Sequence, residues 1–367
     1  MGFKCGIVGL PNVGKSTLFN ALVQQQQAEA ANYPFCTIEP NVGRVSVPDT
    51  RLDIVAKIGG SAQIIPTQLE FVDIAGLVKG ASKGEGLGNQ FLSHIRECDA
   101  IVYVLRCFDN DDITHVEGSI NPLRDKEIIE TELVLADLES LEKRVPNLQK
   151  KAKGGDKDSK EQLEVVEKML VVVSEGKAAR ETVLATEQEK KIAKNLQLLT
   201  TKPAMFVCNV SEDEATTGNA YSQTVEAQAK KENAATVIIS AKIEAEVAML
   251  PTEAEKTEFL EALGLKETGL ARVIRSGYAL LHLITFFTVG PKEARAWTVG
   301  QGSTAPNAAG VIHTDFEKGF IRAETIAYDD FVKYNGESGS KDAGKLRLEG
   351  KEYIVKDGDI FHFRFNV

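Results

Sequence analysis

The sequence predicts an α/β fold with a mostly parallel sheet, a helical insertion and a small C-terminal α+β domain. Three observations predict this fold. A glycine-rich loop at residues 9–16 separates an apolar strand from a helix. Apolar residues recur at heptad spacing between residues 134 and 199. From residue 284 onward, apolar and polar residues alternate as they do in β-strands.

The loop at residues 9–16 reads G-x-x-x-x-G-K-S and predicts a phosphate-binding site. Its glycines leave backbone N–H groups free to surround a phosphate, and the N-terminus of the following helix adds partial positive charge. We expect Lys15 to reach the β- and γ-phosphates and the Ser16 hydroxyl to bind Mg²⁺. The predicted nucleotide-binding residues of this loop are Asn12, Val13, Gly14, Lys15, Ser16 and Thr17.

Two switch-like segments follow in the expected order. Thr37 lies in a proline-rich loop before a strand at 42–47, and we expect its hydroxyl to complete the Mg²⁺ shell. A simple turn residue is the alternative for Thr37. A strand at 68–73 ends in D-x-x-G, where Asp73 would hold Mg²⁺ through water and the Gly76 N–H would bond the γ-phosphate.

Two later strands end in motifs that predict the base-binding end of the site. The strand at 204–209 ends in N-x-x-E, where guanine-specific proteins usually carry N-K-x-D. Val210 replaces the lysine and Glu212 the aspartate, which argues against selection of guanine, while Asn209 can still brace the phosphate loop. The strand at 236–239 leads into Ser240 and Ala241, whose backbone would face the base. The five ordered elements define a GTPase-type P-loop domain with its ligand at the carboxyl ends of the strands.

Composition excludes several functional classes. The chain has 367 residues with a net charge of −10, which argues against diffuse nucleic-acid binding and sequence-specific DNA recognition. It contains no apolar run long enough to span a membrane, and its first strand begins too early for a signal peptide. Five scattered cysteines without C-x-x-C pairs predict reduced thiols and a cytoplasmic location.

The insertion predicts a projecting arm of two long antiparallel helices. Apolar residues follow a narrow heptad seam with charged residues between them, which favours a coiled coil over ordinary packing on the sheet. We expect a turn at 150–157 and a kink or helix end at Pro146. The lysines at the turn are the local candidate for RNA contact, and a solvated turn is the alternative.

The C-terminal region predicts a small mixed sheet over one helix. Strand-like segments lie at 284–289, 294–299, 320–326, 345–348, 353–355 and 360–365, and residues 304–312 favour a short helix. This is the β-grasp arrangement. The region holds no catalytic constellation, so we expect a docking surface there.

The segment at 73–89, together with Asn209-Val210-Ser211-Glu212 and the C-terminal region, resembles the Obg-like ATPase (YchF) family of the Obg-related P-loop NTPases. The resemblance covers essentially the whole chain. It implies preference for ATP over GTP, ribosome binding and a C-terminal TGS domain. The predicted domains are a nucleotide-binding domain at 1–127 and 201–283, a coiled-coil insertion at 128–200 and the TGS-like domain at 284–367.

The family pattern also predicts slow intrinsic hydrolysis. Leu77 follows the D-x-x-G motif where Ras-like enzymes carry the glutamine that orients water. Asn12 matches an asparagine that helps related NTPases to bind K⁺, with a plain turn residue as the alternative. His115 is a candidate water-positioning group, with a structural or solvated histidine as the alternative. Two other functions stay open, a ribosome-associated GTPase and a nucleotide-gated binding protein with incidental hydrolysis.

Overall fold

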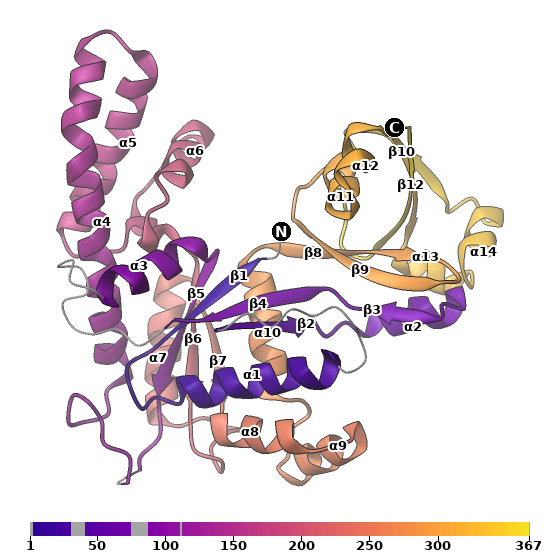
Figure 1. Cartoon of the computed structure of the whole chain (residues 1–367), viewed down its shortest axis with the longest axis horizontal. Helices are drawn as coiled ribbons and strands as arrows, with labels where there is room; N and C mark the ends of the chain where they lie inside the picture. Colours follow the sequence, from indigo (N-terminus) through magenta and orange to yellow (C-terminus); the bar gives the residue numbers. More distant parts are fainter. Residues whose placement is uncertain (1–2, 31–40, 75–86, 111, 367) are drawn as a thin grey trace. The chain divides into compact units, whose positions relative to one another are not determined.

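The computed structural model describes residues 3–30, 41–74, 87–110 and 112–366 (Figure 1). The chain divides into two compact units. Unit 1 comprises Met1–Arg44 and Glu70–Val273, and unit 2 comprises Val45–Leu69 and Ile274–Val367. The predicted boundaries place residues 45–69 in the nucleotide-binding domain, whereas these residues pack in unit 2.

Unit 1 is built on a six-stranded sheet in the order β2-β4-β1-β5-β6-β7. Its strands are β1 Lys4–Val8, β2 Val42–Ser46, β4 Gln68–Asp73, β5 Ala100–Arg106, β6 Ala204–Asn209 and β7 Ala235–Ile239. Strand β1 runs parallel to β4 and β5, and β5, β6 and β7 continue in the same direction. Every residue of β5 and β6 is buried, as strands covered on both faces require. The carboxyl ends of these strands therefore meet at one edge.

Three helices connect strands of this sheet, α1 Lys15–Ala30, α3 Leu87–Glu97 and α7 Ala220–Glu232 (Figure 1). Three more follow β7, namely α8 Ala241–Met249, α9 Glu253–Ala262 and α10 Gly269–Leu280, whose last residues belong to unit 2. The mostly parallel α/β architecture predicted from the strand–loop–helix pattern is thereby confirmed.

The insertion forms two long antiparallel helices, α4 Pro122–Lys153 and α5 Lys157–Ser174, followed by α6 Glu187–Leu196 (Figure 1). The heptad residues of the three helices share one apolar cluster, in which Leu141, Val166 and Ile192 are buried. The expected helix end at Pro146 is wrong, because α4 continues to Lys153. Pro146 is exposed, so water can bond the carbonyl that proline leaves without an N–H partner.

A buried carboxylate fixes the base of this insertion. Asp137 of α4 is 2% exposed and accepts hydrogen bonds from the backbone N–H groups of Leu199 and Thr200, both at 2.8 Å. The Thr200 hydroxyl donates a third bond at 2.6 Å. The residues contacted belong to the 3-10 helix Leu199–Thr201, which leads into β6. Asp137 thus holds α4 to the end of the insertion.

Unit 2 contains a second six-stranded sheet in the order β11-β10-β12-β8-β9-β3. Its strands are β3 Gln63–Ile65, β8 Leu283–Val289, β9 Glu293–Gly300, β10 Phe320–Ala327, β11 Arg347–Glu349 and β12 Asp359–Phe365. Strands β8 and β9 form an antiparallel hairpin, and β12 pairs parallel to β8 and antiparallel to β10. The segment predicted as a strand at 353–355 makes an isolated bridge from Ile354 to Thr304 instead.

Besides the last residues of α10, unit 2 contains the helices α2 Thr50–Gly59, α11 Ala305–Ile312, α12 Thr314–Lys318, α13 Tyr328–Lys333 and α14 Glu337–Asp342. Helix α11 buries Ala305, Ala308 and Ala309 against the aromatic residues of the sheet. Helix α2 buries Leu52, Val55 and Ala56 with residues of β8, β9 and β12, which is why residues 45–69 belong to this unit. None of the described helices is both long and apolar enough to cross a lipid bilayer.

Candidate functional site

The phosphate loop connects the end of β1 to the first residue of α1, at the carboxyl edge of the unit 1 sheet. Gly14 has φ of +91°, and a Cβ there would lie 2.2 Å from Nδ2 of Asn209. A Cβ at Gly9 would lie 2.9 Å from the carbonyl oxygen of Val104. The chain therefore passes too close to its neighbours to carry side chains at these two positions.

The phosphate end of the site contains Lys15 and Asp73. Lys15 is 9% exposed, and its ammonium forms an ion pair with the Asp73 carboxylate at the end of β4. Ser16 and Thr17 are exposed in the first turn of α1. A hydroxyl and a carboxylate at one strand edge are the hard oxygen ligands that Mg²⁺ takes, so Ser16 and Asp73 fit that ion.

The other residues predicted to bind the metal or the γ-phosphate cannot be placed. Thr37 and Gly76, like Leu77, lie outside the described residues. The Mg²⁺ and γ-phosphate assignments at these two positions stay predictions.

Asn209 ties the phosphate loop to the base-binding end. Its Nδ2 donates to the carbonyl oxygen of Val13 at 2.9 Å, and its Oδ1 accepts from the backbone N–H of Ala241 at 2.9 Å. Asn209 is 4% exposed, so water cannot substitute for these bonds. Three segments far apart in the sequence are thereby held in one arrangement.

A cavity of about 780 Å³ opens between these segments. The predicted site residues that line it are Asn12, Gly14, Thr17, Asn209, Val210, Glu212, Ser240 and Ala241. Lys242, the last residue of the predicted S-A-K motif, also lines the cavity, whereas sequence reasoning did not identify the apolar side chains of Phe108, Ile113 and Met249. Met249 is 74% exposed in the last turn of α8. The lining also includes Asp109, Asn110 and Glu246, so the cavity offers apolar surfaces for stacking beside many hydrogen-bonding groups, which suits a planar heterocycle.

An ion pair occupies the position where guanine-specific proteins carry a free aspartate. The Lys242 ammonium lies 2.5 Å from Oε2 of Glu212, and this hydrogen bond raises the pKa of Lys242. Both side chains are solvent-exposed, 66% for Lys242 and 42% for Glu212, so this is a weak surface ion pair at one oxygen of the carboxylate. The argument against guanine selection therefore rests on the sequence, in which Glu212 replaces the aspartate of N-K-x-D.

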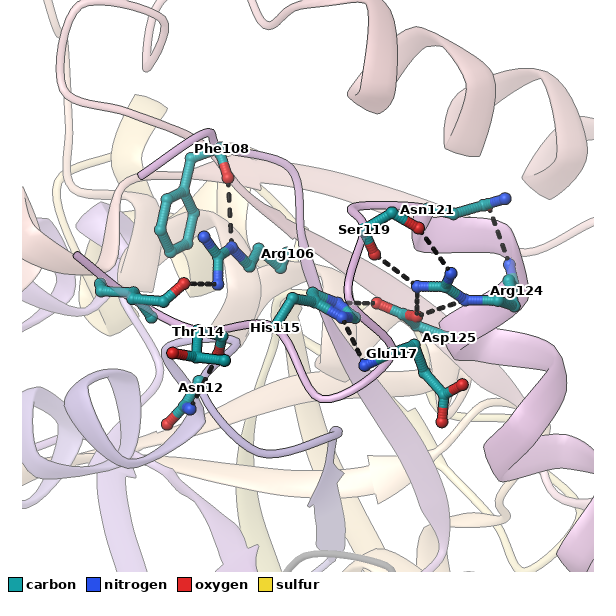
Figure 2. A network of polar contacts seen from close by, with 11 residues as sticks. Asn12, Arg106, Phe108, Thr114, His115, Glu117, Ser119, Asn121, Arg124 and Asp125 are labelled. Carbon is teal, nitrogen blue, oxygen red and sulfur yellow. Dashed lines mark hydrogen bonds and ion pairs between the residues drawn. The ribbon is translucent and has the colours of Figure 1, made fainter. Parts of the chain in front are cut away.

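A loop beyond β5 is held by a buried arginine (Figure 2). Arg106, the last residue of β5, is 2% exposed and donates to the carbonyl oxygens of Phe108, Asn110 and Ile113 at 3.2, 3.1 and 2.9 Å. The guanidinium also lies 4.7 Å from the centre of the Phe108 ring. The sequence signal that could have revealed this role is an arginine at the end of an otherwise apolar strand.

The same loop contacts the phosphate loop and carries His115. Nδ2 of Asn12 donates to the carbonyl oxygen of Thr114 at 3.0 Å. His115 is 8% exposed and is not among the described residues that line the cavity. Its Nε2 lies 2.8 Å from Oδ2 of Asp125 in the first turn of α4 (Figure 2).

Comparison with known proteins identifies the relatives of this chain. Residues 4–137 match the MMR_HSR1 family model, described as 50S ribosome-binding GTPase. Residues 283–366 match the YchF-GTPase_C model, described as a protein of unknown function (DUF933). The protein named ribosome-binding ATPase YchF is 61% identical in Haemophilus influenzae and 54% identical in Bacillus subtilis. Each alignment covers 100% of both chains.

Solved structures agree with these sequence matches. The YchF GTPase of Schizosaccharomyces pombe superimposes with a TM-score of 0.89 at 39% identity, covering 99% of this chain and 98% of that one. A GTP-binding protein of Pyrococcus horikoshii, at 18% identity and a TM-score of 0.62, shares the fold. Because relatives at 61% and 54% identity match along their whole length, this chain belongs to the YchF family of P-loop NTPases.

Proposed function

We propose that this protein is a cytoplasmic, Mg²⁺-dependent ATPase that prefers ATP to GTP and binds the ribosome in a nucleotide-dependent manner. The observation that carries the proposal is the cavity between the phosphate loop and the N-x-x-E segment, with Glu212 already paired to Lys242. The names of the full-length relatives, ribosome-binding ATPase YchF, support both halves of the proposal.

At the phosphate end, Lys15 and the backbone amides of the loop bind the β- and γ-phosphates. Ser16, Asp73 and Thr37 would hold Mg²⁺, which supplies charge neutralisation for the phosphates when bound. The Gly76 N–H senses the γ-phosphate. At the base end, Asn209 holds the phosphate loop in place through its hydrogen bonds. Val210, Ser240 and Ala241 line the position of the base.

Nucleobase preference is predicted to change when the base-binding residues are exchanged. The double substitution Val210→Lys with Glu212→Asp restores N-K-x-D, so a shorter carboxylate faces the guanine edge. We expect the ratio of ATP to GTP affinity to fall about tenfold or more, the worth of one or two polar contacts. Calorimetric titration with both nucleotides measures the ratio, with the single substitution Val210→Ala as the control. An unchanged ratio in the double variant would show that the base is selected by other residues.

Hydrolysis requires a group other than the glutamine that Leu77 replaces. We propose that His115 positions the attacking water after its loop moves and that K⁺, bound near Asn12, adds positive charge at the phosphates. Replacing K⁺ by Na⁺ in the assay is expected to lower turnover without weakening ATP binding. Equal turnover in the two salts would remove K⁺ from the mechanism.

We propose that two parts of the chain contact the ribosome. One is the tip of the arm formed by α4 and α5, which we interpret as a coiled coil. The other is the C-terminal TGS-like domain. The tip carries exposed lysines on a chain of net charge −10, so it is a local basic patch. The lysines are Lys150, Lys151, Lys153, Lys157 and Lys160.

Charge reversal at this tip is expected to weaken ribosome binding. The double substitution Lys150→Glu and Lys151→Glu removes cations that would contact RNA phosphates and should lower affinity about tenfold. Co-sedimentation with ribosomes at several salt concentrations measures both affinity and its salt dependence. In the control, the substitutions Lys230→Glu and Lys231→Glu reverse the charge of two exposed lysines of α7. An equal loss of ribosome affinity in the control would mean that the net charge of the protein, and not the position of the lysines at the arm tip, governs binding.

The proposed function as a whole is tested by steady-state ATP turnover with and without purified ribosomes. A slow intrinsic rate that ribosomes raise several-fold supports a ribosome-linked ATPase. Tight ATP binding with no turnover under either condition would favour the alternative, a nucleotide-gated binding protein with incidental hydrolysis.

A further inference from the structure

Both ring nitrogens of His115 are engaged in this structure (Figure 2). The backbone N–H of Glu117 donates to Nδ1 at 3.1 Å, so Nδ1 carries no hydrogen. The hydrogen of the neutral ring is then on Nε2, where it donates to Oδ2 of Asp125 at 2.8 Å. In this arrangement neither nitrogen is available to accept a hydrogen bond from an attacking water.

The partner on Nε2 is firmly held. Asp125 is 1% exposed, and its Oδ1 accepts from the guanidinium of Arg124 at 3.0 Å. Arg124 also donates to the Ser119 hydroxyl at 2.9 Å, which fixes the segment between His115 and α4. Because water does not reach the carboxylate, breaking its bond to the imidazole would leave a buried charge with one partner fewer.

The same carboxylate belongs to the arm. Helix α4 runs without interruption from its first turn at Asp125 to Lys153, a length of about 42 Å at 1.5 Å per residue. On its other side the His115 loop is bonded to the phosphate loop through Asn12 and Thr114. The histidine therefore lies on a continuous path of contacts between the phosphate loop and the arm helix.

We propose that Asp125 is the positioning residue of His115 and acts as a latch, through which helix α4 keeps the imidazole turned away from the nucleotide. A partner that displaces the first turn of α4 breaks the Nε2–Asp125 bond and frees the ring to contact the γ-phosphate water. The inference rests on the proposed water-positioning role of His115. It adds to that role the residue that restrains the histidine and the element through which a partner acts.

The latch is tested first on the unaltered protein by nuclear magnetic resonance of ¹⁵N-labelled histidine. The resonances of His115 are assigned by their loss in His115→Gln. We expect the neutral tautomer with hydrogen on Nε2 and slow exchange of that hydrogen with water. The Nδ1-protonated tautomer, or a rapidly exchanging Nε2 hydrogen, would overturn the proposal without any substitution at Asp125.

The kinetic test is the isosteric substitution Asp125→Asn, which removes the charge of the acceptor. We expect the basal kcat for ATP to rise about tenfold with KM unchanged, because Asp125 is not among the described residues that line the cavity. Stimulation by ribosomes should fall by the same factor, since the latch is already weakened. A basal kcat equal to or below that of the unaltered protein would overturn the latch.

A matched control is Asp137→Asn, which alters another buried carboxylate of α4 that contacts Leu199 and Thr200 instead of His115. It should lower the melting temperature but leave the His115 resonances and basal kcat unchanged. The double variant His115→Ala with Asp125→Asn should fall to the rate of His115→Ala alone. If His115→Ala hydrolyses ATP at the normal rate, His115 does not position the attacking water. The resonances of His115 in the unaltered protein then still decide whether Asp125 holds the imidazole ring.

Discussion

Replacing Lys15 with alanine is expected to reduce ATP turnover by about 10²- to 10³-fold, the cost of removing one preorganised donor from a charged transition state. Lys15 is a nearly buried cation at the start of α1, and its ammonium already meets a carboxylate at the strand edge where the phosphates would lie. Turnover and calorimetric ATP affinity should both fall. Full activity in Lys15→Ala would remove the phosphate-site assignment altogether.

The control for this substitution is Lys202→Ala. Lys202 lies in the same unit and donates to the carbonyl oxygens of Arg96, at 3.1 Å, and Cys98. It is not among the described residues that line the cavity. Its loss should affect stability but not ATP affinity. Thermal unfolding of both variants separates a damaged site from a damaged fold, since Asp73 loses an ion-pair partner in Lys15→Ala.

The second large effect is expected for Gly14→Ala, which should abolish measurable nucleotide binding. The added Cβ would lie 2.2 Å from Nδ2 of Asn209, at a position whose φ of +91° is itself strained for alanine. Asn209 would have to give up its bond to Val13, and the phosphate loop would lose its connection to the base-binding end. Titration with ATP and with a slowly hydrolysed analogue measures the loss.

Gly155→Ala separates backbone strain from this steric conflict. Gly155, at the turn between α4 and α5, has a nearly identical φ of +90°, and no described atom lies within 4 Å of its added Cβ. The substitution should cost about 1–2 kcal/mol of stability and leave ATP affinity unchanged. If Gly14→Ala bound ATP as well as Gly155→Ala does, close packing of the loop against Asn209 would not matter for binding.

The phosphate loop and the strand-end motifs could be predicted because each is a contiguous run with a fixed local geometry. Asp73 and Asn209 end recognisable strands, Lys15 follows the loop after another, and parallel strands bring their carboxyl ends together. The two long antiparallel helices could likewise be predicted from one periodic seam.

The remaining features depend on contacts between residues distant in sequence. The engagement of Glu212 by Lys242 joins the loop after β6 to the first turn of α8, 30 residues apart, and no local pattern reveals it. The burial of Arg106 depends on how the following loop folds back over it.

Residues 50–59 were not predicted to join the C-terminal unit, because an amphipathic helix does not indicate which sheet it covers. The pairing of His115 with Asp125 was missed for a similar reason, since sequence marks the histidine but not its orientation.

The central claim, that this site selects ATP, is tested most directly by measuring the affinities of the purified protein for ATP and GTP analogues side by side in Mg²⁺. Clearly tighter ATP binding is the predicted result, because Val210 and Glu212 replace the lysine and aspartate of N-K-x-D and Glu212 is paired with Lys242. Clearly tighter GTP binding would contradict it. Glu212 would then have to leave Lys242 to bind guanine, and the protein would be a ribosome-associated GTPase.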